Sequence, residues 1–341
     1  MMHPDPNHSS PCPRGKWSAT ATIAVVVLAL AAAVFLLTRM DTLGNSGGPA
    51  GTFLYESVAF PPTDPSLIHY YPSKTFSPNL ATLTSVSAGE GFILAGGDKA
   101  VVVLDTDSSQ RRRIDLDRPV RCLASSGKSI FIAGRNSWCI VAIDATGPTE
   151  WFELDAKANI SSIAVAPDGR ELFIADRGNG WVWRFDARGK VLGFIGRDSE
   201  TLKPSHFAVQ KILCFDLAMG ADGLLRIVDP VSHRIETYRP DGTLMTSWGQ
   251  EGGIDGFVGC CNPTDIAMFP DGRIVTSQKG PRLPRVKIYD ADGHLLSVVA
   301  MPDAFAQDNA GMDIAVDSAG NVLVADVADG KIHVFKKKDG I

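Results

Sequence analysis

The chain has 341 residues, of which 45% are hydrophobic and 21% charged, with a formal net charge of -5 and a pI near 5.8. This composition provides enough apolar residues for a large core and excludes an intrinsically disordered chain. The net negative charge also excludes nucleic acid as the expected partner, because nucleic-acid-binding proteins need a basic face.

The N-terminus carries an uncharged apolar run. Residues 18–38 contain no Asp, Glu, Lys or Arg, and at about 1.5 Å per residue they span a hydrocarbon core of about 30 Å. Trp17 suits a membrane interface, and Arg14 and Lys16 precede the run, which favours a cytoplasmic N-terminus. A cleaved signal peptide is the alternative, but the run exceeds its usual length of about 7 to 15 residues and no A-x-A-like site follows.

The sequence therefore predicts four segments. These are a cytoplasmic tail over residues 1–16, a transmembrane anchor over 17–39, a linker over 40–66 and a folded domain over 67–341. Residues 41–51 are small, polar and Gly-rich, as in a flexible tether. We expect a single-pass membrane protein whose folded domain is extracytoplasmic, and periplasmic in a Gram-negative type of envelope.

The folded domain contains an internal repeat. Its clearest copies are SIAVAPDGRELFIAD, DLAMGADGLLRIVD, DIAMFPDGRIVTSQ and DIAVDSAGNVLVAD. Each copy has the pattern of a β-hairpin, with an apolar strand, a tight turn ending in Gly and a second β-rich strand. Each then continues with a third strand and another turn, as in RIETYRPDG and RVKIYDADG.

Two weaker copies lie upstream, SVSAGEGFILAGGDKAVVVLD and RCLASSGKSIFIAGRNSWCIVAID. Six units of about four strands predict an all-β, six-bladed β-propeller.

The last unit lacks its fourth strand, because the chain ends at Ile341. We expect the segment LIHYYPSKTF, at residues 67–76, to supply this strand and to close the ring.

These motifs resemble those of the NHL-repeat propellers. The resemblance lies in the D-x-A, D-G and V-A-D pattern of each unit and in the later R-I/V-x-x-Y/F pattern, and it covers about residues 85–341. The block GCCNPTDIAMFPDGRIVTSQKGPRLPRVKIYDADG is similar to a bacterial subgroup of these proteins. The resemblance implies the fold more than the function, because one fold can carry many activities.

Propeller topology separates the loops by face. The short turns between the first and second strands of a unit lie on one face, and the longer loops lie on the other. The longer-loop face is therefore our expected ligand-binding face. Its candidate residues are Cys260, Cys261, Asn262, His206, Asp229, His233, Lys279 and Arg285.

Three aspartates, Asp216, Asp265 and Asp313, occupy equivalent positions at the start of the inner strands. The earlier units have Ser85, Cys122 and Ser162 there. If these side chains face the axis, they form a polar ring that could hold a divalent cation in the central channel. The interpretation that we favour over this one is that each carboxylate accepts a backbone N–H bond from the neighbouring unit, as repeated Asp residues commonly do.

The adjacent cysteines Cys260 and Cys261 allow several interpretations. They could form a strained vicinal disulfide, pair separately, or bind a soft metal together with Cys214. No CxxC motif and no H-E-x-x-H motif is present, so spacing gives no support for a zinc enzyme. No catalytic residue and no firm cofactor follow from the sequence.

The sequence favours a binding or scaffolding module over an enzyme. The expected partners are the membrane, through residues 17–39, and an extracytoplasmic protein or small-molecule ligand. The alternative is a redox or metal-dependent enzyme that uses the Cys260 and Cys261 loop.

Overall fold

The computed structural model describes residues 63–127, 129–134, 141–144, 147–150, 154, 156–201, 206–207, 214–259, 261–280, 285–306 and 311–340. All of them belong to the unit Phe60–Ile341. The predicted cytoplasmic tail, the anchor at 17–39 and nearly all of the linker lie outside the described residues. Within the described part, no helix has the length and apolar character needed to cross a bilayer.

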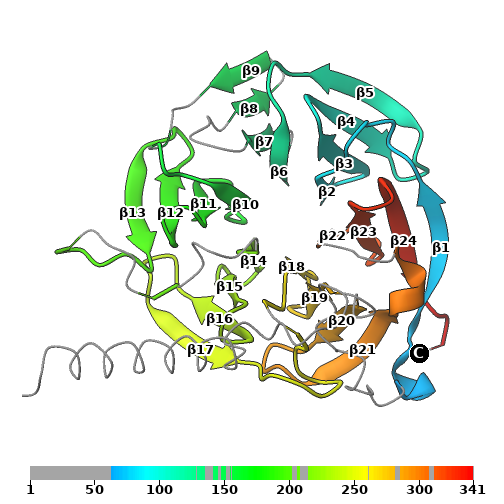
Figure 1. Cartoon of the computed structure of the whole chain (residues 1–341). Helices are drawn as coiled ribbons and strands as arrows, with labels where there is room; N and C mark the ends of the chain where they lie inside the picture. The colour runs from blue at the N-terminus through cyan, green and yellow to red at the C-terminus, as the bar shows by residue number, and fades with distance from the viewer. Residues whose placement is uncertain are drawn as a thin grey trace, which may run out of the picture. The chain divides into compact units, whose positions relative to one another are not determined.

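The described strands pair into six antiparallel, four-stranded sheets, which lie around a ring (Figure 1). Sheet 1 contains β2 (Ser85–Gly89), β3 (Phe92–Gly97), β4 (Ala100–Asp105) and β5 (Gln110–Asp115). Sheet 2 contains β6 (Val120–Ser126), β7 (Ser129–Gly134), β8 (Val141–Asp144) and β9 (Gly147–Glu150). Sheet 3 contains β10 (Ile160–Val165), β11 (Glu171–Asp176), β12 (Trp181–Asp186) and β13 (Val191–Ile195).

Sheet 4 contains β14 (Leu217–Met219), β15 (Leu225–Asp229), β16 (Arg234–Tyr238) and β17 (Leu244–Trp248). Sheet 5 contains β18 (Asp265–Met268), β19 (Ile274–Gln278), β20 (Arg285–Tyr289) and β21 (Leu295–Ala300). Sheet 6 contains β22 (Met312–Val316), β23 (Val322–Asp326), β24 (Lys331–Lys337) and β1 (Tyr70–Phe76). Two short 3-10 helices, η2 (Pro65–Leu67) and η4 (Pro302–Ala304), complete the described elements. Five sheets are described with their side chains throughout, whereas β8 and β9 of sheet 2 are described as backbone only.

The first hairpin of sheets 3 to 6 contains the tight turn that the repeat predicted. Gly223 and Gly320 have φ of +75° and +77°, a left-handed conformation that glycine adopts without steric cost. The strands on either side alternate in burial or are wholly buried, so their apolar residues face the neighbouring sheets. The all-β propeller fold predicted from the repeats is thus confirmed.

Strand β1 completes sheet 6, as the sequence predicted. It pairs antiparallel with β24 in a register that runs from Tyr70 opposite Lys337 to Phe76 opposite Ile332. Tyr70 is buried at 3% exposure, and the Lys338 ammonium donates to the Ile68 carbonyl at 2.7 Å. The chain thereby joins its last sheet with a strand from before its first sheet, and β1 takes the place of β24 as the outer edge of sheet 6.

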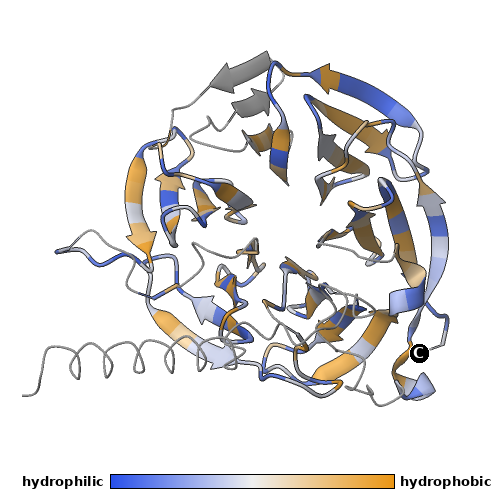
Figure 2. Cartoon of the chain, viewed as in Figure 1, coloured by the Kyte–Doolittle hydropathy of each residue, from blue (hydrophilic) through white to orange (hydrophobic). Residues whose placement is uncertain are grey.

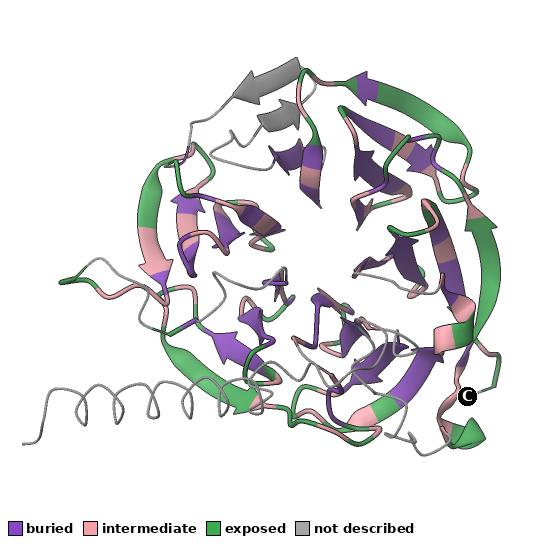
Figure 3. Ribbon diagram, viewed as in Figure 1, coloured by how far each residue is buried: buried purple, intermediate pink, exposed green. Residues whose placement is uncertain are grey.

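The core of the described unit lies between the sheets. Six clusters of buried apolar residues each join two neighbouring sheets, and one of them joins sheet 6 to sheet 1 through residues such as Val86 and Leu323. Buried residues are concentrated on the inner strands, whereas the outer strands β5, β17 and β1 are largely exposed (Figure 3). Apolar residues also occur on outer strands, such as β13 and β21 (Figure 2). A single four-stranded sheet cannot bury both faces, so closure of the ring is what creates the core.

Candidate functional site in the central channel

One end of the ring carries the connections between sheets and the turns between the second and third strands. We call this end the connection face. A cavity of about 200 Å³ opens there, and the first residues of the inner strands line it. The lining that bears on chemistry consists of Arg121, Arg177, Cys214, Asp216, Asp265 and Asp313. The three aspartates also border a second hollow of about 230 Å³ further along the inner strands, so they stand between two spaces in the channel.

Each channel aspartate bonds to the backbone of the next sheet. The carboxylates accept N–H bonds from Ile266 to Asp216 at 2.7 Å, from Ile314 to Asp265 at 3.1 Å, and from Val86 to Asp313 at 2.6 Å. This is the structural hydrogen bond that the sequence offered as the alternative to a cation site. The bond to Val86 joins the last sheet to the first, so one of the three stabilises ring closure directly.

Burial dominates the electrostatics of these carboxyls. It raises the pKa of Asp216 to about 7 against a hydrogen bond from Ser162, and it raises the pKa of Asp313 to about 6. Burial, followed by the charges of Asp216 and Asp313, raises the pKa of Asp265 well above its usual value. Hydrogen bonding between Asp265 and Asp313 also raises the pKa of Asp265 and lowers that of Asp313.

The same cavity also contains positive charge. Arg121 is half-buried, its Nε atom has no hydrogen-bond partner, and its charge lowers the pKa of Asp313. Arg177 donates from Nε to the Asn159 side chain at 3.0 Å. The cavity therefore offers carboxyl groups and guanidinium groups to the same bound molecule. Sequence reasoning missed Arg121, although it directly precedes Cys122, the residue that aligns with the aspartates.

Two of the predicted ligand-binding residues, Asn262 and Lys279, contact each other. Asn262 is fully buried; its amide donates to the carbonyls of Val258 at 2.7 Å and Lys279 at 3.0 Å, and its oxygen accepts the Lys279 N–H at 2.9 Å. Lys279 in turn donates from Nζ to the Cys214 sulfur at 3.1 Å. Asn262 thus fixes the backbone of a lysine that reaches the cavity lining.

The remaining predicted residues have other partners. Cys261 is half-buried with φ of +65°, and Cys260 lies outside the described residues. Asp229 accepts N–H bonds from Val231 and Ser232 in its own turn. The His233 ring is 3.0 Å from the Gly259 carbonyl, which ties this turn to the connection between sheets 4 and 5.

His206 and Arg285 also lie apart from the cavity lining. The His206 Nε2 atom is 2.8 Å from the buried carboxylate of Glu236, which also accepts the Tyr238 hydroxyl at 2.7 Å. Arg285 is buried in β20, and this burial lowers its pKa. The predicted residues therefore share the connection face without forming one cluster.

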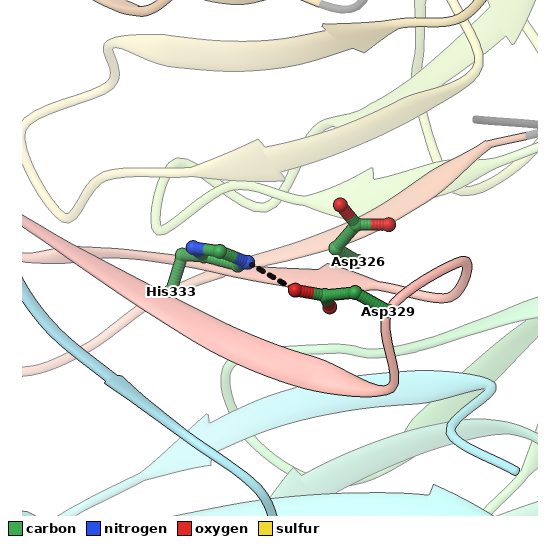
Figure 4. Close-up of side chains that lie close together, drawn as sticks. All are labelled: Asp326, Asp329 and His333. Atoms are coloured by element: carbon green, nitrogen blue, oxygen red, sulfur yellow. Dashed lines mark ion pairs between the residues drawn. The ribbon is translucent and has the colours of Figure 1, made fainter. Parts of the chain in front are cut away.

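One group of metal-ligating side chains in the described part of the chain has its ligand atoms all within 4.8 Å of one another. It consists of Asp326, Asp329 and His333, in the second hairpin of sheet 6 (Figure 4). It is not the channel ring of aspartates, where the sequence placed a possible divalent cation.

The fold and the cavity define the class of this protein as a β-propeller with a polar channel cavity. No family model matches the chain, and neither does any curated protein. Among solved structures, it is similar to a protein of unknown function from Bacteroides thetaiotaomicron, with a TM-score of 0.56 and 14% identity over 77% of this chain and 72% of that one. It is also similar to streptogramin B lyase, with a TM-score of 0.53 and 13% identity over 79% of this chain and 98% of the lyase.

A third similar structure is virginiamycin B lyase from Staphylococcus aureus. Its TM-score is 0.56 and its identity 11%, over 79% of this chain and 100% of the lyase. At these identities the likeness shows the propeller fold alone.

Proposed function

We propose that this chain is a six-bladed, NHL-like propeller that acts as a binding module for a small zwitterionic ligand. The observation that carries the proposal is the presence of opposite charges in one cavity: Arg121, with a buried Nε that has no partner, and the three channel aspartates. A cavity of about 200 Å³ matches a ligand about as large as an amino acid. The ligand's acidic group would pair with Arg121, and its ammonium group would pair with the carboxyls.

Binding should therefore be coupled to protons. Asp216 and Asp313 have pKa values raised to about 7 and about 6, so a ligand ammonium group would favour their ionised forms and release protons. A scaffolding role for a protein partner would use the surface of the same face and would not require this proton release.

The test is equilibrium dialysis of the full-length chain, purified in detergent, against a mixture of the twenty amino acids and glycine betaine. The retained compound is then titrated by calorimetry in two buffers that differ in ionisation enthalpy. Arg121→Met should weaken its binding at least about tenfold, because the acidic group loses the guanidinium proposed to pair with it. Arg170→Met is the matched control, since Arg170 is exposed in a turn at the opposite face. Retention of none of these compounds, or equal binding by Arg121→Met, would reject the zwitterion proposal.

We also propose that residues 17–39 anchor the propeller to a membrane and that the propeller lies outside the cytoplasm. The support is the uncharged run at 18–38 and the cationic residues that precede it. The chain should stay in the membrane fraction after alkaline extraction, and protease added to spheroplasts should digest the propeller. Release by alkali, or full protection of the propeller in spheroplasts with an intact membrane, would contradict this topology.

A second candidate function is thiol chemistry at the connection face, as in a redox or metal-dependent enzyme that uses Cys260 and Cys261. The specific observation in its favour is a third cysteine at the same face: the Cys214 sulfur lines the cavity and accepts from Lys279 Nζ at 3.1 Å. Counting of alkylated cysteines with and without reductant tests it. Identical counts in both conditions, with no metal in the purified chain, would remove the support for this function.

A further inference from the structure

The second hairpin of sheet 6 brings two carboxylates and an imidazole together. Asp326 ends β23 and is fully buried, Asp329 lies in the turn, and His333 lies on β24 (Figure 4). Asp326 accepts backbone N–H bonds from Ala328 at 3.0 Å and from Ala306 at 2.8 Å. This carboxylate is thus held in place by two different segments of the chain.

His333 is oriented in the way that metal-binding histidines usually are. Its Nδ1 is 3.2 Å from the hydroxyl of Thr75 on β1, and its Nε2 is buried without a hydrogen-bond partner. Nε2 lies 3.4 Å from Oδ2 of Asp329, which is too long for a good hydrogen bond. Two ligands of one tetrahedral ion with bonds near 2.1 Å are also about 3.4 Å apart. Metal-bound histidines commonly have a hydrogen-bond partner on one ring nitrogen, here Nδ1, which fixes the ring and leaves Nε2 for the ion.

The repeat supplies an internal comparison. In sheet 3, Asp176 pairs with Trp181, five residues later in the sequence. Asp326 pairs with Lys331 in the same way in sheet 6, so the two hairpins have the same register. The buried Asp176 carboxylate there accepts the Asn179 amide at 2.8 Å and the Trp183 indole N–H at 2.9 Å.

Sheet 6 replaces both of these donors with metal ligands. Asp329 stands where sheet 3 has Asn179, and His333 stands where it has Trp183. A second carboxylate beside a buried one is unfavourable unless a cation neutralises the pair. Lys331 supplies part of this charge, but its Nζ is 3.4 Å from Asp329 Oδ2 and its side chain is half-exposed.

We propose that Asp326, Asp329 and His333 bind a divalent transition-metal ion of the Zn²⁺ or Mn²⁺ class. One imidazole nitrogen with two carboxylates suits such ions, whereas Ca²⁺ and Mg²⁺ prefer oxygen ligands alone. The site does not depend on the ligand proposed for the channel. Its neighbours indicate its role: Thr75 lies on the closing strand β1, and Ala306 lies in the connection between sheets 5 and 6. The bound ion would therefore stabilise the sheet that closes the ring.

The test uses the full-length chain in detergent, freed of metal with a chelator and titrated with MnCl₂ while free Mn²⁺ is followed by electron paramagnetic resonance. Mn²⁺ is the first probe because thiolates, which this chain also carries, are poor ligands for it. Zn²⁺ is then measured by competition and should bind more tightly than Mn²⁺. Zn²⁺ at one hundred times its Kd should raise Tm by about 5 °C.

Three variants locate the ion. Asp329→Asn introduces the residue that sheet 3 has at this position, so the variant should fold without metal while its Kd rises at least about tenfold. His333→Ala should weaken binding by a similar factor. His294→Ala is the matched control, because His294 Nδ1 also lies close to an aspartate oxygen, Asp290 Oδ2, at 2.8 Å. His294 is largely exposed, however, and is not part of the metal-ligating group found among the described residues. Its Kd should equal that of the wild type.

The proposal fails if neither ion binds saturably to the wild type, or if Asp329→Asn and His333→Ala bind as tightly as the wild type. It also fails if Ca²⁺ binds more tightly than Zn²⁺, since that order would exclude the imidazole as a ligand.

Discussion

The substitution Asp216→Asn tests the role of the channel carboxyls. Asp216 is buried, and its Oδ2 accepts the N–H of Ile266 in the next sheet at 2.7 Å. The asparagine oxygen can accept the same bond, but the amide carries no charge at any pH. The variant therefore separates the hydrogen bond between the sheets from the cost of burying a carboxylate.

The pKa of Asp216 gives the size and sign of the effect. Burial raises it from 3.8 to about 7, so between these pH values the folded chain binds more protons than the unfolded chain. The stability that comes from the protonated carboxyl is therefore complete below pH 3.8 and is lost as the pH rises through 7. At 1.36 kcal/mol per pKa unit, the loss is about 4 kcal/mol. Asp313, with a pKa raised to about 6, acts in the same direction.

The assay is urea unfolding followed by circular dichroism at pH 5, 6, 7 and 8. The wild type should lose stability over this range, and Asp216→Asn should lose clearly less and be the more stable protein at pH 8. Asp168→Asn is the control, because Asp168 is exposed in a turn. A wild type whose stability rises from pH 5 to 8, or an Asp216→Asn variant with the full wild-type slope, would refute this account of the channel.

Three further predictions concern the closing strand, a buried lysine and the Asn262 clamp. Tyr70→Ala should lower the free energy of unfolding by about 3 kcal/mol, because the Tyr70 side chain is 3% exposed and packs between sheets. Tyr71→Ala is the control and should change this free energy by less than about 0.5 kcal/mol, because Tyr71 is 43% exposed; urea unfolding compares the two variants. Burial lowers the pKa of Lys287 from 10.5 to about 7, so the unfolded chain binds more protons in this interval and stability should rise from pH 7 to 10; Lys287→Met should remove that rise. Asn262→Ala removes three hydrogen bonds to the backbone of Val258 and Lys279 and should cost at least about 2 kcal/mol; a thermal melt matching that of the wild type would contradict this clamp.

The repeat made the fold predictable because hairpins are local. Alternating apolar residues and a glycine turn specify each pair of strands within about fifteen residues, as in DIAVDSAGNVLVAD, where Gly320 takes the left-handed conformation at φ of +77°. Closure was predictable too, since a last unit that lacked a strand required one from elsewhere, and β1 pairs with β24. The hydrogen bonds of the channel aspartates followed from their equivalent positions in the repeat.

The functional contacts were not predictable in the same way, because their partners lie far apart along the chain. Lys279 meets Cys214 across 65 residues, and His333 meets Thr75 across 258 residues. Sequence spacing reports which residues share a strand, but not which side chains from separate strands converge. That convergence depends on how the sheets pack around the axis, so the channel cavity emerges only once the ring has closed. The group formed by Asp326, Asp329 and His333 lies within one hairpin, but only the pairing of β23 with β24 shows that their ligand atoms meet.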